Sequence, residues 1–234
     1  MSNEDPVYAD LHDHRGSPAQ TLDKIIEWTL AAVLGTEAGI VLMRAKNSME
    51  TFAPTSDLVR DAHDWQVQLS EGPSFVVLDE VDHPSVIIGD TAEDPRFPTW
   101  GPKAAELGLR SVITSVLRTP DRRVGSLNVY SPEPHAFDLD DLEAVDVFAR
   151  RAARAIVIAE EAQGREVALD TRKLIGQAQG MLMERFRIDG DRAFELLVRL
   201  SQQHNVKLRG VADLLVRNPS AGLDELESML PSAS

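Results

Sequence analysis

The stretch Thr171-Arg-Lys-Leu-Ile-Gly-Gln-Ala-Gln-Gly-Met-Leu-Met-Glu-Arg185 decides how the C-terminal part of the chain folds. Its apolar residues recur at three- and four-residue spacing, which predicts a helix with one buried stripe. The members of this stripe are Thr171, Leu174, Ala178, Met181 and Leu182. The cations and amides that lie off the stripe are Arg172, Lys173, Gln177, Gln179 and Arg185. The stretch therefore predicts a helix whose outer face is basic and rich in amides.

Two glycines, Gly176 and Gly180, lie one helical turn apart in this stretch. A glycine inside a helix costs about 1 kcal/mol relative to alanine, so we expect a neighbour that approaches the backbone closely there. Such a helix suits a tight helix contact or a surface that binds a polyanion. The alternative is an ordinary core helix with a solvated outer face.

The charge of the chain is unevenly distributed. The net charge is −14, which argues against a nucleic-acid partner if the chain is treated as one object. Residues 165–217, however, contain ten Lys and Arg against seven Asp and Glu, whereas residues 218–234 contain three acids and no cation. A basic segment within an acidic chain indicates a polyanionic partner for that segment.

Composition excludes several classes of protein. The 234 residues include no cysteine, which excludes disulfides, thiol catalysis and cysteine–zinc or iron–sulfur sites. The acidic N-terminus lacks the pattern of a secretory signal, and no apolar run is long enough to cross a membrane. We therefore expect a cytoplasmic protein with no membrane association.

The N-terminal part alternates between helical and strand patterns. Helical spacing is predicted over residues 18–34, 58–69, 75–78 and 100–107, and strand patterns over residues 38–45, 49–53, 85–89, 111–118 and 124–130. The strand pairs 38–45/49–53 and 111–118/124–130 are predicted to be hairpins. About six strands with interspersed helices predict an α+β domain with a largely antiparallel sheet.

A long helix is predicted to follow this domain. Asp138 is a suitable N-cap, and no proline occurs between it and Pro219. Apolar residues then follow the 3-4 pattern of a coiled coil, at Leu142, Val145, Ala149, Ala152, Ile156 and Ala159. The pattern resumes after Gly164 with Val167 and Leu174. Since such a seam usually pairs with a copy of itself, we expect a parallel homodimer through the 138–181 helix.

Two shorter helices are predicted after Arg185. Asp189 or Asp191 is the expected cap of the first, whose apolar face comprises Ala193, Phe194, Leu197 and Leu200. Asn205 can adopt the left-handed conformation that ends it. The second helix is expected from about Lys207 to Val216. The prediction is thus a three-helix bundle, in which Gly176, Gly180 and Phe194 pack closely.

These residues resemble two known families. The motifs Ile175-Gly-Gln-Ala178, Leu182-Met-Glu-Arg185, Ala193-Phe194 and Lys207-Leu-Arg209 are similar to ANTAR domains, three-helix output modules that bind RNA in bacterial transcription antitermination. Glu71-Gly-Pro73, Asp94-Pro-Arg-Phe97 and Pro120 to Tyr130 resemble GAF sensor domains of actinobacterial type. The expected organisation is a flexible N-terminus (1–16), a GAF-like domain (17–160), an ANTAR-like domain (161–217) and an acidic tail (218–234).

The resemblance implies an RNA-binding antitermination regulator in which the GAF-like domain controls two ANTAR-like bundles that bind tandem RNA hairpin loops. The residues expected to contact RNA are Arg172, Lys173, Gln177, Gln179, Arg185, Lys207 and Arg209. No DNA partner is expected. The alternative is a ligand-sensing signalling protein whose helical bundle binds a protein partner.

Two positions depart from the families. Gln179 stands where ANTAR sequences of this type usually have lysine, which removes one phosphate contact although an amide can still bind a base edge. Ser74 follows Gly-Pro where many related GAF domains have cysteine, so thiol sensing is not implied.

Enzymatic activity and bound metals are not expected. The chain contains no Walker loop, no Gly-x-Ser-x-Gly and no His-Glu-x-x-His motif. Its six histidines, at positions 12, 14, 63, 83, 135 and 204, are scattered, which favours surface or structural roles. No cofactor is indicated, whereas an unidentified small molecule in the GAF-like domain is compatible with the resemblance.

Overall fold

The computed structural model describes residues 18–44, 48–79, 84–220, 222, 225 and 228–230. The predicted flexible N-terminus and most of the predicted acidic tail lie outside these residues. The chain divides into two compact units, Met1–Glu160 and Glu161–Ser234, which are considered separately below. In the described part of the chain, no helix combines the length and apolar composition that a membrane span requires.

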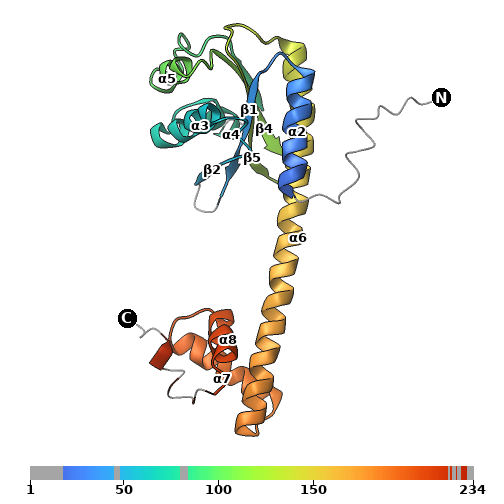
Figure 1. Cartoon of the computed structure of the whole chain (residues 1–234), viewed down its shortest axis with the longest axis vertical. Helices are drawn as coiled ribbons and strands as arrows, with labels where there is room; N and C mark the ends of the chain where they lie inside the picture. Colours follow the sequence, from blue (N-terminus) through green and yellow to red (C-terminus); the bar gives the residue numbers. More distant parts are fainter. Residues whose placement is uncertain are drawn as a thin grey trace, which may run out of the picture. The chain divides into compact units, whose positions relative to one another are not determined.

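The first unit is built on an antiparallel sheet with helices on both faces (Figure 1). The described residues form five strands in the order β2-β1-β5-β4-β3, where about six were expected. The strands are β1 (Glu37–Met43), β2 (Met49–Phe52), β3 (Ser85–Ile88), β4 (Ser111–Arg118) and β5 (Arg123–Ser131). The helices that accompany them are α2 (Pro18–Ala32), α3 (Asp57–Leu69), α4 (Pro73–Asp79), α5 (Trp100–Glu106) and α6 (Leu139–Phe186).

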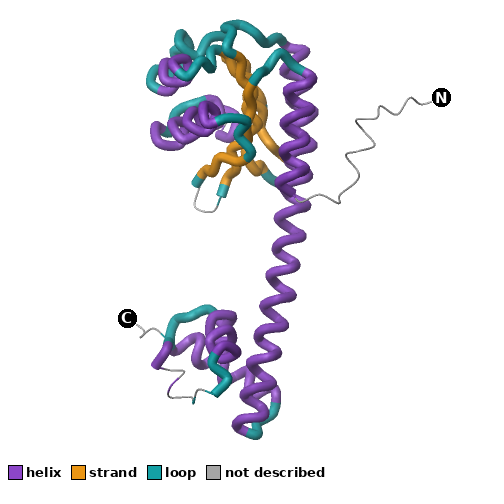
Figure 2. Tube along the Cα trace, in the orientation of Figure 1, coloured by secondary structure: helices purple, strands orange, loops and turns teal. Residues whose placement is uncertain are grey.

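Both predicted hairpins are confirmed. In the β1–β2 pair Ile40 lies opposite Phe52, and in the β4–β5 pair Val112 lies opposite Tyr130. Figure 2 shows the strands converging in one layer between the helices. Since successive residues of a strand point to opposite faces, this register determines which side chains meet on each side of the sheet.

Helices α2 and α6 cover one face of the sheet. Their apolar residues form one core with alternate residues of β1, β4 and β5, such as Ile40, Ile113 and Leu127. The α6 residues in this core are Val145, Ala149, Ala152, Ala153 and Ile156. The predicted coiled-coil seam is therefore wrong over this part of the helix, because the chain's own sheet and α2 bury the stripe that a second copy was expected to cover.

The opposite face of the sheet is covered by α3, α4 and α5. A second core lies here around Trp100, which is fully buried and donates from its indole nitrogen to the carbonyl of Ala62 at 2.9 Å. The carboxylate of Glu71 accepts from the backbone N–H groups of Thr99 and Trp100, at 2.7 Å each. A residue remote in sequence thus caps the start of α5, whose own Thr99 makes no side-chain cap.

Helix α6 is continuous over 48 residues, as the absence of proline predicted. The carboxylate of Asp138 accepts from the backbone N–H groups of Asp140 and Asp141, which confirms it as the cap. Gly164 does not interrupt the helix. All side chains from residue 161 to residue 170 are exposed.

The second unit consists of the C-terminal part of α6, α7 (Gly190–Gln203) and α8 (Leu208–Arg217). Asp189, one of the two expected caps, caps α7, and Asn205 has a φ of 50°, the left-handed conformation predicted for it. The core is formed by Ala178, Leu182, Ala193, Leu197, Leu200, Val211, Ala212, Leu215 and Leu230. Leu230 comes from the predicted tail, so part of that segment completes the core of the bundle.

Candidate functional site

Five of the predicted site residues in the second unit have side chains with no partner in the described part of the chain. Arg172, Lys173 and Gln177 on α6 are exposed, as are Lys207 and Arg209 at the start of α8. None of these five side chains makes a hydrogen bond or ion pair with another described residue. They are therefore available to an external ligand, and the cations carry unneutralised charge.

Gln179 and Arg185 differ from these five residues because they bind within the bundle. The amide nitrogen of Gln179 donates to the carbonyl of Gly190, at 3.2 Å, and so joins α6 to the first residue of α7. The guanidinium of Arg185 donates to the carbonyl of Pro219 after α8. Both side chains are half-buried. Their geometry supports a structural role in addition to, or in place of, the predicted RNA contact.

The predicted close packing of Gly176, Gly180 and Phe194 is wrong for contacts within this chain. A methyl group added to either glycine would meet no heavy atom within 4 Å. Phe194 is 41% exposed. The reason is that α6 buries the stripe around Ala178 and Leu182, whereas the two glycines lie on its solvent side.

The bundle carries further cations, which were not among the RNA-binding residues predicted from the sequence. Arg187 and Arg199 are exposed and have no described partner, whereas Arg192 and Arg217 are paired with Asp189 and Asp213 at 3.8 and 2.8 Å. Arg187 also has a φ of 52°, at the turn between α6 and α7. Sequence spacing could have identified these cations but not which of them are neutralised.

The first unit contains a buried polar cluster between the sheet and helices α3 and α4. The amide oxygen of Asn128 on β5 accepts from Thr114 on β4 at 2.8 Å and from Ser74 on α4 at 3.2 Å. The backbone N–H of Ser74 in turn donates to the side-chain oxygen of Gln66 on α3, at 2.9 Å. We refer to His63, Gln66, Ser74, Thr114, Ser126, Asn128 and Tyr130 as the polar cluster; each is at most 1% exposed.

Several atoms of the polar cluster lack a partner among the described residues. They are both ring nitrogens of His63, the amide nitrogen of Gln66 and the hydroxyl of Tyr130. Burial lowers the pKa of His63 to about 3 and raises that of Tyr130, so both groups are neutral at pH 7. A buried polar atom without a hydrogen bond costs about 1–3 kcal/mol, so four of them together suggest a partner for the cluster.

Sequence interpretation missed this cluster. A signal was nevertheless present, because Ser126, Asn128 and Tyr130 are polar residues at alternate positions of β5. Alternation places them on one face of the sheet. Their meeting with α3 and α4 could not be predicted, because it depends on long-range packing.

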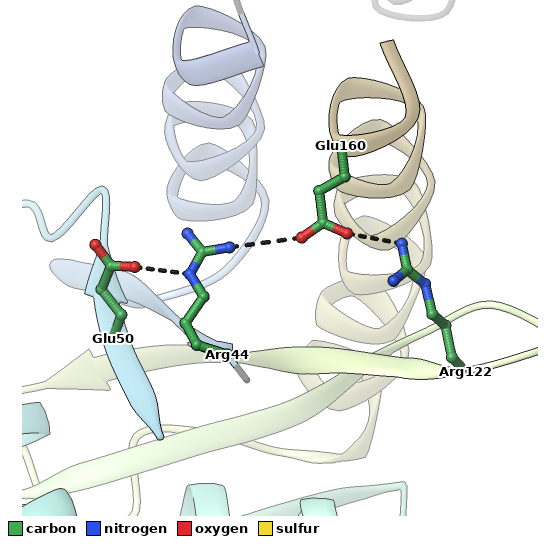
Figure 3. Close-up of polar contacts among 4 residues, drawn as sticks. All are labelled: Arg44, Glu50, Arg122 and Glu160. Atoms are coloured by element: carbon green, nitrogen blue, oxygen red, sulfur yellow. Dashed lines mark hydrogen bonds and ion pairs between the residues drawn. The ribbon is translucent and has the colours of Figure 1, made fainter. Parts of the chain in front are cut away.

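Near the turn between β4 and β5, Glu160 of α6 lies between two arginines (Figure 3). Its carboxylate lies 2.7 Å from Arg122, in the turn between β4 and β5, and 3.5 Å from Arg44, directly after β1. Arg44 also pairs with Glu50 of β2 at 2.7 Å. These four residues, which we call the Glu160 network, tie α6 to the ends of both hairpins.

Comparison with known families agrees with this architecture. A family model of the GAF domain matches residues 17–156, which is more than half of the chain, and a model of the ANTAR domain matches residues 164–216. The chain belongs to the GAF–ANTAR proteins. GAF and ANTAR domains are sensor and regulatory domains rather than catalytic ones.

Solved structures are similar to the GAF domain of this GAF–ANTAR chain in fold. A domain of a two-component sensor histidine kinase protein from Sinorhizobium meliloti is 15% identical, with a TM-score of 0.52 over 63% of this chain and 96% of that one. GAF domains of phosphoenolpyruvate-protein phosphotransferases from Acinetobacter and from Coxiella burnetii are each 14% identical, with TM-scores of 0.52 over 68% of this chain and 92% of theirs. At this identity the likeness concerns the fold alone. A search of curated proteins finds no match to the chain.

Proposed function

We propose that this GAF–ANTAR protein binds RNA through its ANTAR domain and acts in transcription antitermination under the control of its GAF domain. The observation that carries the proposal is the coincidence of the ANTAR match with unpaired cations at Arg172, Lys173, Lys207 and Arg209. These cations would bind phosphates, while the exposed amide of Gln177 would read the bases of an RNA loop.

Each bundle offers few cations, so the proposed functional species is a homodimer that binds two paired hairpin loops. A second hairpin contact in the same complex gains from effective concentration. The exposed side chain of Val167, which lies on the predicted apolar stripe of α6 and is 45% exposed, supports a contact between copies along this segment. Binding of both hairpins would stabilise an RNA structure that excludes a terminator hairpin.

The proposal is tested by measuring the affinity of the full chain for an RNA with two hairpins and for each hairpin alone, over a range of salt concentrations. We expect the tandem RNA to bind more tightly than either single hairpin, with an affinity that falls steeply as salt rises. Absence of RNA binding, together with salt-insensitive binding to a protein partner, would instead support a protein-interaction module. Light scattering at micromolar concentration tests the dimer.

We also propose that the polar cluster is where the GAF domain binds a small molecule. The observation that favours it is the set of unpartnered atoms on His63, Gln66 and Tyr130. Since the cluster contains no ionised side chain, the ligand would be neutral and rich in hydrogen-bonding groups. A thermal-shift screen of neutral compounds, with Tyr130→Phe as the comparison, tests this; a compound that stabilises both proteins equally binds elsewhere.

A further inference from the structure

A continuous line of contacts leads from the polar cluster to helix α6. It begins at Ser74, near the start of α4, whose hydroxyl lies 3.2 Å from the amide oxygen of Asn128. It continues at the end of the same helix, where the carbonyls of Val77 and Leu78 accept from the guanidinium of Arg123. Helix α4 is thus bound at one end to the polar cluster and at the other to the first residue of β5.

The residue before Arg123 completes this line. Arg122 lies in the β4–β5 turn, whose geometry is held by a hydrogen bond from the backbone N–H of Thr119 to the Arg122 carbonyl, at 2.9 Å. Its guanidinium lies 2.7 Å from the carboxylate of Glu160 on α6. Arg122 in the turn and Arg123 at the start of β5 therefore bind two different helices, α6 on one face of the sheet and α4 on the other.

Glu160 lies at the point where α6 leaves the sheet. Apolar packing of α6 against the sheet extends to Ile156 and Val157, and every side chain from residue 161 to residue 170 is exposed. The Glu160 network is thus the last contact of α6 with the first unit among the described residues. Its members are 37–57% exposed, and ion pairs of this kind contribute little stability, so the network can be released at small cost.

We propose that α4 and the β4–β5 turn form a coupling element that transmits changes in the polar cluster to the Glu160 network and so controls the order of α6 where it leaves the sheet. A shift of α4 at Ser74 moves the carbonyls that hold Arg123, and the turn then withdraws Arg122 from Glu160. The element contacts the polar cluster at one end and the Glu160 network at the other, which gives the coupling a continuous physical path. The inference deepens the proposed sensor role of the GAF domain and rests on it.

Amide hydrogen exchange of the full chain without RNA tests the coupling. The probe is the exchange rate of α6 peptides over residues 157–166 in Ser74→Ala, Glu160→Gln and the double variant. We expect each single variant to accelerate exchange about threefold or more, and the double variant to match Glu160→Gln alone, because both changes act through one contact. Arg122→Gln removes only the Arg122–Glu160 pair and leaves Arg44 beside Glu160, so it should accelerate exchange in the same direction but by no more than Glu160→Gln. This variant does not depend on how well Ser74→Ala folds.

Two matched controls separate coupling from general loosening. Glu161→Gln changes the neighbouring exposed glutamate, and Ser111→Ala removes another buried serine, whose hydroxyl donates to the carbonyl of Glu133 at 2.7 Å, away from α4. Neither should change exchange at residues 157–166. The inference is overturned if Ser74→Ala leaves this exchange unchanged, or accelerates it equally in the presence and absence of Glu160. Because no RNA is present, these outcomes are independent of whether the ANTAR domain binds RNA.

Discussion

The side-chain amide of Gln179 on α6 donates to the carbonyl of Gly190, the first residue of α7, at 3.2 Å. This bond explains how the bundle uses an amide at a position where similar ANTAR sequences usually carry lysine. A lysine would place a charge beside the start of α7, whereas the amide joins the two helices without one. Gln177, two residues earlier, is exposed and has no described partner.

The two glutamines should therefore respond differently to substitution. We expect Gln179→Ala to lower the free energy of unfolding of the second unit by about 1 kcal/mol, the usual value of a single hydrogen bond, with little change in RNA affinity. Gln177→Ala should leave stability unchanged and weaken RNA binding. Urea denaturation and RNA titration of both variants check the pair. The opposite pattern would indicate that Gln179 contacts RNA rather than stabilising the bundle.

Leu230 provides a second test of the bundle. It is 8% exposed and packs in the same core as Leu182 and Leu215, outside the segment that the ANTAR model matches. We expect Leu230→Ala to destabilise the second unit by about 2–3 kcal/mol through reduced apolar burial and a residual cavity. Met229→Ala, at a neighbour that is 45% exposed, is the control. Equal melting temperatures for the two variants would show that Leu230 does not belong to the core.

The loop before α5 offers a third prediction. The Glu71 carboxylate supplies both hydrogen bonds that cap this helix from outside. Glu71→Ala should therefore cost about 1–2 kcal/mol of stability in the first unit, as removal of a helix cap does. Glu106→Ala, at an exposed position of the same helix, should cost much less. Thermal denaturation of the two variants distinguishes them, and equal effects would contradict the capping role.

Burial of His63 predicts a dependence of stability on pH. Its pKa is lowered to about 3 by burial, so between pH 6.5 and 3 the unfolded chain binds a proton that the folded chain does not. The contribution of His63 to stability is therefore fully present above pH 6.5 and decreases by about 1.4 kcal/mol per pH unit below it. Urea denaturation at pH 7.5 and 5.0 should show a smaller decrease in stability for His63→Leu than for the wild type. His135→Gln, at an exposed histidine, should retain the full decrease.

Local patterns predicted much of the fold. The alternation in Ser111–Arg118 and Arg123–Ser131 and the turn between them were enough to predict the hairpin. Residue type predicted the cap Asp138 and restricted the cap of α7 to Asp189 or Asp191, of which the structure has Asp189. What the patterns could not show is which partner covers an apolar stripe. Val145 and Ala149 follow a coiled-coil spacing, yet the chain's own sheet and α2 bury them.

For the candidate sites too, local sequence patterns predict which side chains are exposed but not which partners they bind. The exposure of Arg172 and Lys173 follows from helical spacing, because they lie off the apolar stripe. The partners of Gln179 and Arg185 are contributed by later segments of the chain, and no local pattern predicts them. The polar cluster likewise joins residues from α3, α4, β4 and β5, so only the packed structure brings His63 close to Tyr130, with ring centroids 6.0 Å apart.

RNA affinity of a double-cation variant tests the central claim most directly. Arg172→Ala/Lys173→Ala removes two cations from the proposed RNA surface, and Arg150→Ala/Arg154→Ala removes two exposed cations from the part of α6 in the first unit, with the same change in net charge. We predict that the first variant lowers the slope of log affinity against log salt by about 1 for each phosphate that it no longer binds, and that the second behaves as the wild type. Equal affinities and slopes for both variants and the wild type would contradict an RNA-binding role for this face of the ANTAR domain.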